Sequence, residues 1–179
     1  MNLIVVTGAP ATGKYTIGKA IGEAFNYRLL HNQLIVNVAN SVFDFGSKGF
    51  QMMKQRVRRA CVESIQAYPP SGVVVTLCYG GPVSERFIEP LSQLAVSTQG
   101  KVVELPLCAN RFILLERISA QGRADMGKLT DGVILSRILD QWPLSGIDCC
   151  KTLPSIRTGN RDVEMSIKEA IDVVSSELS

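Results

Sequence analysis

The sequence is poor in the residues from which several familiar sites are built. It contains a single histidine, His31, and none of its five cysteines forms a Cys-x-x-Cys pair. A structural zinc site is therefore nearly excluded, because such sites draw their ligands from paired cysteines and histidines. Hydrolase chemistry through a Ser-His-Asp or Cys-His arrangement would have to run through His31 alone.

Long apolar runs and a strong charge excess are also missing. No stretch approaches the ~20 continuous apolar residues of a membrane helix. The apolar run Leu3–Val6 stops at Thr7, which is not a signal-peptide pattern. The formal net charge of +3 is too small to indicate a nucleic-acid partner, and an odd number of free cysteines is typical of a reducing compartment. We therefore expect a cytoplasmic protein that binds neither nucleic acid nor membrane.

Strand-like and helix-like segments alternate along the 179 residues. Short apolar runs predict strands, and apolar residues at helical spacing predict helices. The expected strands are 3–7, 27–31, 73–77, 101–108 and 155–158. The expected helices are 14–25, a long one from the cap Ser47 to the break at Pro69, 82–96 with a kink or split at Pro90, 110–120 with Phe112 inward, a short one over about 132–142, and 165–178. This alternation predicts a single α/β domain over residues 1–179, with a three-layer arrangement and a parallel sheet of about five strands.

The segment that carries chemistry directly follows the first expected strand. It reads Gly8-Ala9-Pro10-Ala11-Thr12-Gly13-Lys14 and fits the phosphate-loop pattern G-x-x-x-x-G-K. Glycines let the backbone fold tightly so that successive N–H groups face a phosphate, and the helix beginning near Lys14 adds the positive end of its dipole. The alternative is an ordinary glycine-rich turn, which is less favoured because an apolar strand precedes the motif and an amphipathic helix follows it.

Tyr15 departs from the usual phosphate-loop pattern, because Ser or Thr normally holds magnesium at that position. Its hydroxyl lies too far from the backbone to replace that of a serine. The segment from Gly8 to Thr16 nevertheless resembles the G-x-P-x-x-G-K-x-T loop of adenylate kinases and their relatives. The resemblance implies that residues 8–16 bind ATP, that Lys14 is catalytic, and that Thr16 contacts phosphate or reaches Mg²⁺ through water.

A second segment resembles the helix and lid of small-molecule and nucleoside monophosphate kinases. It comprises Leu114–Ile118, Arg123 and Gly127–Thr130, and residues 120–130 would form the lid. The resemblance implies that Arg117 and Arg123 are catalytic residues that close over the triphosphate. A guanidinium suits that task because it offers paired donors to the charge that spreads over the transferring group. The alternative is that both arginines are solvated charges at a helix end.

The acceptor side is less well defined. His31 and Asn32 follow the second expected strand, where related kinases hold the phosphate acceptor, and an imidazole can accept a proton near neutral pH. A structural hydrogen-bonding role for His31 is the alternative. Arg56 either binds an anionic acceptor, such as a nucleotide monophosphate or a sugar acid, or is a solvated charge. Gly80 and Gly81 are similar to the glycine-rich turn of shikimate kinases, although a plain turn explains them equally well.

Arg157 lies where such folds pass the adenine base, so it is either a stacking residue or part of a simple turn. The leading interpretation is an ATP- and Mg²⁺-dependent kinase, resembling the adenylate kinase and shikimate kinase group, that phosphorylates a small molecule. The alternative is a degenerate nucleotide-binding regulator of the same fold, because Tyr15 breaks the pattern and strand 73–77 does not end in the usual Asp. We expect a monomer or a small homo-oligomer.

Overall fold

The computed structural model describes residues 1–78, 82–124, 127–141, 149–159 and 161–179. Within them, six strands pair in parallel in the order β2-β3-β1-β4-β5, and β6 pairs with the carboxyl end of β4. The bounds are β1 Asn2–Thr7, β2 Arg28–His31, β3 Gly72–Leu77, β4 Val102–Cys108, β5 Lys151–Thr152 and β6 Ile156–Arg157. The predicted parallel α/β sheet is confirmed.

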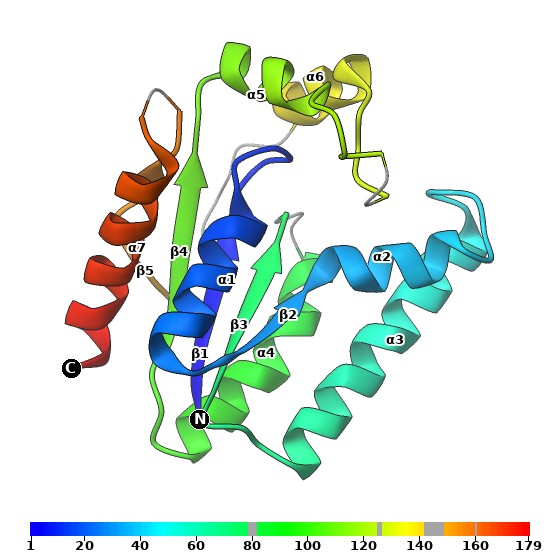
Figure 1. The fold of residues 1–179 in the computed structure, drawn as a ribbon. Helices are drawn as coiled ribbons and strands as arrows, with labels where there is room; N and C mark the ends of the chain where they lie inside the picture. Colours follow the sequence, from blue (N-terminus) through cyan, green and yellow to red (C-terminus); the bar gives the residue numbers. More distant parts are fainter. Residues whose placement is uncertain (79–81, 125–126, 142–148, 160) are drawn as a thin grey trace.

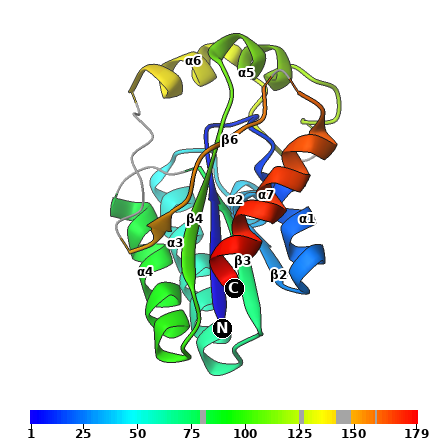
Figure 2. The same ribbon diagram turned by 90° about the vertical axis from the view of Figure 1, so that its left-hand side faces the viewer.

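Helices cover both faces of this sheet, which gives the three layers seen in Figures 1 and 2. The bounds are α1 Lys14–Phe25, α2 Asn32–Asn40, α3 Lys48–Ala67, α4 Pro82–Ser97, α5 Arg111–Ile118, α6 Gly132–Gln141 and α7 Val163–Leu178. One face packs against α1 and α7, through Ile17 and Val174, and the other packs against α3 and α4, through Val62 and Leu91. Among the described residues, no helix has the length and apolar character needed to cross a membrane.

The two central strands are buried on both faces. Leu3, Ile4, Val5 and Val6 of β1 have no exposed surface, and every residue of β3 is buried. Near-continuous apolar runs of this kind are typical of parallel strands covered by helices on both sides. Because neighbouring strands run parallel, their carboxyl ends meet at one edge of the sheet, where this class of fold binds its ligands.

The helix α2 is a finding that the sequence pattern did not indicate. It begins directly after β2, its N-cap His31 makes no side-chain capping bond, and asparagines at both ends and in the middle are weak helix formers. The helix is instead stabilised by packing, because Ile35 and Ala39 are almost fully buried. α2 consequently carries the chain away from the end of β2 toward α3 (Figure 1).

Two details of the expected helices are wrong. Pro90 does not split α4, which continues to Ser97. Phe112 does not face inward: its side chain is 75% exposed, whereas Leu114 and Ile118 of the same helix are buried. These two residues pack with Ala9 and so connect α5 to the loop that follows β1.

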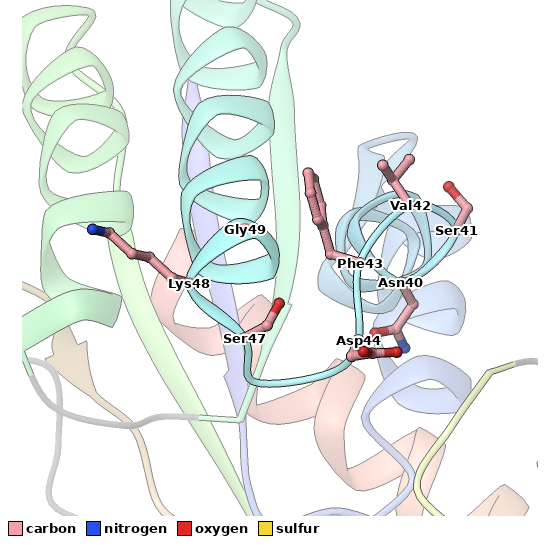
Figure 3. A pocket seen from close by; sticks show the side chains of 8 residues that line it. All are labelled: Asn40, Ser41, Val42, Phe43, Asp44, Ser47, Lys48 and Gly49. Atoms are coloured by element: carbon pink, nitrogen blue, oxygen red, sulfur yellow. The ribbon is translucent and has the colours of Figure 1, made fainter.

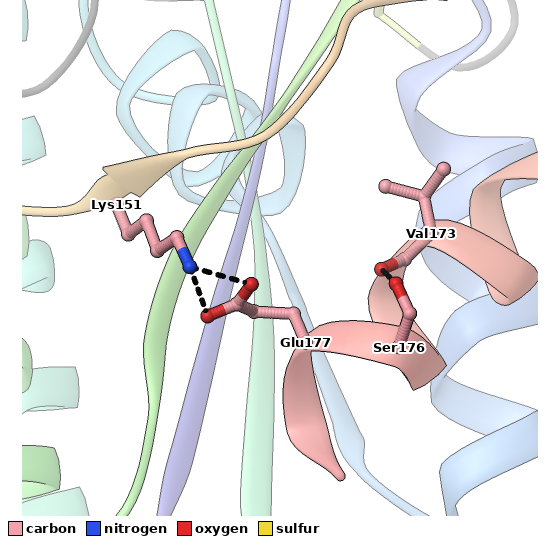
Figure 4. Close-up of polar contacts among 4 residues, drawn as sticks. All are labelled: Lys151, Val173, Ser176 and Glu177. Atoms are coloured by element: carbon pink, nitrogen blue, oxygen red, sulfur yellow. Dashed lines mark hydrogen bonds and ion pairs between the residues drawn. The ribbon is translucent and has the colours of Figure 1, made fainter.

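The last helix is joined to the edge of the sheet near its C-terminus. Lys151 Nζ of β5 donates to both carboxylate oxygens of Glu177, at 2.7 and 2.8 Å (Figure 4). Ser176 Oγ donates to the carbonyl oxygen of Val173 in the same turn, at 2.8 Å. The Lys151 side chain is 65% exposed, so the ion pair positions the helix end and contributes little to stability.

A carboxylate lies inside the sheet below the loop that follows β1. Glu104 of β4 is only 2% exposed, and its Oε1 accepts a hydrogen bond of 2.6 Å from Thr7 Oγ1. Its Oε2 accepts a hydrogen bond of 3.1 Å from Thr152 Oγ1. Glu104 therefore joins β1, β4 and β5 through hydrogen bonds to hydroxyl groups, and a buried carboxylate needs such donors to offset its lost hydration.

We expect Glu104→Ala to lower the free energy of unfolding by about 3 kcal/mol, because it leaves the buried hydroxyl of Thr7 without its acceptor, removes the hydrogen bond from Thr152 and opens a cavity. Urea denaturation followed by circular dichroism measures the change. Glu104→Gln is the matched control: it retains one acceptor oxygen and the side-chain volume, and should lose about 1 kcal/mol. Equal stability of the wild type and the alanine variant would contradict this account.

Candidate functional site

The loop between β1 and α1 has the backbone conformation that its glycines predict. Gly8 has a φ of 148°, and a Cβ there would lie 2.6 Å from the carbonyl oxygen of Leu107 and 2.7 Å from Thr12 Oγ1. Gly13 has a φ of 89°, in the left-handed region that favours glycine. Both glycines of the motif are therefore required by the turn that the loop makes, the first by close approach and the second by its backbone angle.

Hydrogen bonds hold the loop from inside. Thr12 is 1% exposed, and its Oγ1 donates to the carbonyl oxygen of Ala9 at 2.9 Å. Thr158, after β6, donates through Oγ1 to the carbonyl oxygen of Thr12 at 2.9 Å. The N-cap of α1 is Gly13, which has no side chain to bond the first-turn N–H groups. These N–H groups and the helix dipole are thus available for an anion, as in phosphate-binding loops.

Lys14 folds back onto this loop. Its Nζ donates to the carbonyl oxygens of Gly8 and Ala9, at 2.8 and 2.7 Å. Burial lowers the pKa of Lys14 to about 8; Cys78 opposes this shift, and the positive charges of Arg123 and Lys128 add to it. Cations from α1 and from the predicted lid segment therefore gather beside one loop, an arrangement that favours a multiply charged anion.

The side chain of Tyr15 turns toward the end of β2. Its ring centroid is 4.8 Å from that of His31, and Lys128 Nζ lies 5.2 Å from the same ring. Thr16, one residue further along α1, is exposed. The hydroxyl of Thr16 is therefore the side-chain oxygen left at the position where the resemblance implies a magnesium contact. Among the described residues, no group of three or more His, Cys, Asp or Glu side chains can hold a metal ion.

His31 stands at the carboxyl end of β2 with its two ring nitrogens in different surroundings. Nδ1 lies 2.5 Å from Thr76 Oγ1 of β3, while Nε2 is buried and has no hydrogen-bond partner among the described residues. Burial, together with the charges of Lys128 and Lys14, lowers the pKa of His31 to about 4. The expectation that His31 titrates near neutral pH is therefore wrong: its imidazole is neutral at pH 7.

A buried arginine, which sequence reasoning missed, lies next to this histidine. Arg58 of α3 is 7% exposed and donates to Asn32 Oδ1 through Nε at 3.2 Å and Nη2 at 2.7 Å. Its guanidinium also stacks on the ring of Phe87, at 4.9 Å. Burial lowers the pKa of Arg58, and no carboxylate pairs with it among the described residues.

The predicted acceptor residue Arg56 is exposed on the same helix, at a distance from the buried face. The spacing of α3 contained the missing signal. Phe50 and Val62 lie on its buried stripe, and Arg58 falls on the same stripe eight residues after Phe50 and four before Val62. A charged residue on an apolar stripe is expected to have a specific partner, because burying an unpaired charge is costly. Arg56 lies off that stripe and is exposed. A binding role for Arg56 stays a prediction.

The described part of the predicted lid segment, 120–124 and 127–130, contacts α2 at Gly127. Gln33 Nε2 donates to the carbonyl oxygen of Gly127 at 2.8 Å, and a Cβ on Gly127 would lie 2.5 Å from Asn37 Oδ1. Arg123 donates through Nε and Nη2 to the carbonyl oxygen of Leu129, at 3.1 and 3.0 Å. The guanidinium of Arg123 thus braces its own loop beside the phosphate-binding turn.

On the other side of the loop, Arg117 Nη2 donates to the carbonyl oxygens of Thr158 and Gly159, at 2.6 and 3.3 Å. A hollow of about 480 Å³ opens there. It is lined by Cys108, Ala109, Asn110, Arg157, Gly159 and Arg161. The structure therefore places Arg157 beside the phosphate loop, and Arg117 beneath the turn that holds the wall of the hollow.

A second hollow, of about 600 Å³, lies between α2 and α3. Figure 3 shows its lining residues, Asn40, Ser41, Val42, Phe43, Asp44, Ser47, Lys48 and Gly49. This hollow is at the far end of α2 from His31, about 13 Å along a nine-residue helix. It is therefore separate from the phosphate loop. Gly80 and Gly81, predicted to contact the acceptor, lie outside the described residues.

A phosphate loop at the carboxyl edge of a parallel three-layer sheet defines a P-loop fold. No family model and no curated protein sequence matches the chain. A gluconokinase from Sinorhizobium meliloti 1021 superposes with a TM-score of 0.64 at 17% identity, covering 99% of this chain and 93% of that one. A sugar kinase from Janibacter sp. HTCC2649 superposes with a TM-score of 0.65 at 14% identity, covering 98% of this chain and 95% of that one.

A shikimate kinase from Bacteroides thetaiotaomicron superposes with a TM-score of 0.60 at 17% identity, covering 99% of this chain and 98% of that one. The neighbours are therefore similar over nearly their whole length, while their sequences have diverged. The chain has the fold of P-loop small-molecule kinases, which confirms the group of folds that residues 8–16 resemble.

Proposed function

We propose that this protein is a kinase that transfers the γ-phosphoryl group of ATP to a small molecule carrying a hydroxyl and an anionic group. The observation that carries the proposal is the position of His31. Its unpartnered Nε2 is buried beside Tyr15, at the same sheet edge as Lys14 and the phosphate loop. A donor site for phosphate and a neutral base for an acceptor hydroxyl are the two halves that phosphoryl transfer requires.

The donor half consists of residues 8–16 together with the hollow lined by Arg157. Backbone N–H groups of the loop and of the first turn of α1 would bind the phosphates, and the base would lie in that hollow. Lys14 would exchange the carbonyl oxygens of Gly8 and Ala9 for phosphate oxygens, which hold a cation more strongly. The neighbours' printed names, gluconokinase, sugar kinase and shikimate kinase, support this assignment.

The residues present fit a magnesium ion that keeps most of its ligands as water and phosphate oxygens, because Thr16 offers an exposed hydroxyl and the described residues hold no cluster of metal ligands. Bound there, the ion would neutralise charge that develops on the transferring group. Thr16 would hold it through water, while Tyr15, directed at His31, would not contribute.

We assign residues 120–130 the role of a lid within one kinase unit spanning 1–179. Arg123 and Lys128 would bring positive charge over the triphosphate, and the closed segment would exclude water that competes with the acceptor. Arg117, which donates to the carbonyl oxygens of Thr158 and Gly159, would fix the wall of the base site. Arg123 thus keeps the predicted task over the triphosphate, whereas Arg117 takes a structural task in place of the predicted catalytic one.

The acceptor half uses His31 as the general base. In the tautomer in which Nδ1–H donates to Thr76 Oγ1, the lone pair of Nε2 would be available to the acceptor hydroxyl. Nε2 would take the proton of the acceptor hydroxyl while the oxygen of that hydroxyl bonds to the γ-phosphorus. The bond between the γ-phosphorus and the bridging oxygen that stays with ADP would break. The neutral state of His31 at pH 7 makes it competent as a base without a prior deprotonation.

Arg58 and Asn32 would recognise the anionic group of the acceptor. A guanidinium that is nearly buried and faces an amide oxygen is poorly compensated, and a carboxylate or phosphate of the acceptor would complete its pairing. This places the anionic group next to His31, since Asn32 is the following residue. The acceptors this favours are sugar acids and other hydroxylated acids, or phosphorylated small molecules.

We expect Arg58→Met to raise the KM for an anionic acceptor about a hundredfold, with little change in kcat, because it removes an ionic contact made in both ground and transition states. Methionine retains packing against Phe87, and the melting temperature checks that the fold persists. Arg59→Met, which removes an exposed ion pair with Glu63 on the same helix, is the control for loss of charge and should leave KM within about twofold. A KM unaltered in Arg58→Met would show that the guanidinium serves only structure.

The proposal is tested by incubating the protein with γ-labelled ATP and a panel of sugar acids, sugars, nucleoside monophosphates and other hydroxylated molecules. With the wild-type protein, label should appear on a hydroxylated anion. When a Lys14 variant replaces the wild type, no label should be transferred. Tight ATP binding without transfer to any acceptor, and without hydrolysis that depends on Lys14, would refute the kinase and favour a degenerate nucleotide-binding protein. The five cysteines are free, which supports a cytoplasmic location, with the small-molecule acceptor as the partner.

A further inference from the structure

Tyr15 is the residue of the phosphate loop that the proposed function leaves without a task. It occupies a position at which a small hydroxyl side chain normally faces magnesium, yet its ring lies against the acceptor side of the site. The centroid of the His31 ring is 4.8 Å away, at an interplanar angle of 49°. Lys128, from the predicted lid, lies over the same ring with Nζ 5.2 Å from its centroid.

We propose that Tyr15 is a positioning residue that couples the lid to the acceptor base, because one ring supports the His31 imidazole and also receives Lys128 when the lid is down. The proposal rests on the kinase function proposed above. It assigns to Tyr15 no contact with the reacting atoms and no contact with metal.

The first half of this coupling is the orientation of the imidazole. The hydrogen bond between Nδ1 and Thr76 Oγ1 fixes one edge of the His31 ring but leaves the ring face free to tilt. The Tyr15 ring lies at 49° to that face and limits the tilt. With both constraints present, Nε2 is held in a buried position, and no described residue hydrogen-bonds to it. A serine at position 15 would leave this side of the imidazole open to water.

The second half is the position of the lid. Lys128 can reach Tyr15 because the neighbouring Gly127 is fixed against α2 by Gln33 Nε2, at 2.8 Å from its carbonyl oxygen. Gly127 approaches α2 closely, since a Cβ there would lie 2.5 Å from Asn37 Oδ1 and would displace that side chain, and the φ of 62° at Gly127 also favours glycine. When the lid lifts, Lys128 leaves the Tyr15 ring and the cation–π contact is lost. The Tyr15 ring therefore contacts both Lys128 of the lid and the imidazole of His31, the proposed base.

Two readouts test the coupling, and the first does not depend on catalysis. The chain has one histidine, so the Cε1–H resonance of His31 is identified without ambiguity by NMR near neutral pH. An aromatic ring this close displaces that resonance through its ring current. Tyr15→Phe should retain the displacement, whereas Tyr15→Leu and Tyr15→Ser should lose it. Tyr68→Leu, at an 87% exposed tyrosine on the C-terminal end of α3, is the control and should change nothing.

The second readout is a double-mutant cycle on turnover of the labelled acceptor. Tyr15→Leu should lower kcat about tenfold while the KM for ATP stays nearly constant, and Tyr15→Phe should retain most of kcat. Lys128→Met should lower kcat by a clearly smaller factor in the Tyr15→Leu background than in the wild type, because the part of its effect that passes through the Tyr15 ring is already lost there.

The outcomes separate this proposal from the proposed function. A displaced His31 resonance that needs an aromatic residue 15, in a protein that phosphorylates nothing on the panel, would retain the ring contact and refute the kinase. Turnover that falls equally in Tyr15→Phe and Tyr15→Leu would overturn the coupling, because the hydroxyl and not the ring would then matter. Fully additive effects of Lys128→Met and Tyr15→Leu would overturn it as well.

Discussion

Replacing Lys14 by methionine should lower the rate of phosphoryl transfer about a thousandfold while the protein remains folded. Methionine retains the length of the side chain but removes the ammonium group, and with it the charge that would neutralise the transferring phosphoryl group. In the free protein this charge is held by the carbonyl oxygens of Gly8 and Ala9. Single-turnover transfer from γ-labelled ATP measures the effect directly.

Lys19→Met is the matched control, because Lys19 lies on the same helix and makes only an exposed ion pair with Glu23. It should leave the rate within about twofold. A pH series adds a second check. Because the pKa of Lys14 is lowered to about 8, the charged form is lost as pH rises through 8, and the affinity for ATP should fall over that range in the wild type. The Lys14→Met variant should show no such decrease, and an identical decrease would contradict the assignment.

The parts of the fold that the sequence predicted are those whose signal is local. β1 and β3 are unbroken apolar runs, and their burial on both faces is what such runs require. α2 could not be predicted in this way, because its stability comes from the burial of Ile35 and Ala39 in the folded chain and not from helix propensity or a cap. Pro90 was expected to break α4 on the same local grounds, and the packed helix continues through it.

The site divides in a similar manner. The phosphate loop is a contiguous motif whose glycines the backbone itself demands, so residues 8–14 could be predicted from spacing. Arg58 and Asn32 are 26 positions apart in the sequence. The apolar stripe of α3 indicates that Arg58 is buried, but no local pattern indicates that Asn32 is its partner. Glu104 is a second example, because a single carboxylate in an apolar strand shows its hydroxyl partners on β1 and β5 only once the sheet is formed.

The cations of the site would allow a chain with a net charge of only +3 to bind the proposed triphosphate. Lys14 comes from α1, whereas Arg123 and Lys128 come from the predicted lid segment. The charges of Arg123 and Lys128 lower the pKa of Lys14, and the charge of Arg123 lowers the pKa of Lys128. Repulsion among them in the free protein is the unfavourable term that a bound anion removes. Charge gathered locally by the fold, and not the overall excess, therefore sets the affinity.

His31→Asn should lower kcat about a hundredfold and remove the acid limb of the pH–rate profile. In the wild type, kcat/KM for the acceptor should fall as the pH drops through about 4, because protonation of Nε2 removes the base. Burial depresses this pKa first, and Lys128 from the predicted lid and Lys14 from α1 depress it further. Asparagine retains a hydrogen bond to Thr76 without offering a group that accepts a proton.

Stability provides the independent check on the same residue. The pKa of His31 is 6.5 in an unfolded chain and about 4 in the folded one, so the folded protein binds the proton less readily. The contribution of His31 to the free energy of unfolding should therefore be fully present above pH 6.5 and should be lost as the pH falls toward 4. The decrease in the free energy of unfolding over this range should be smaller in His31→Asn. Urea denaturation across that range measures both curves. If the variant retains both the acid limb and the full decrease, another group is responsible and His31 serves structure alone.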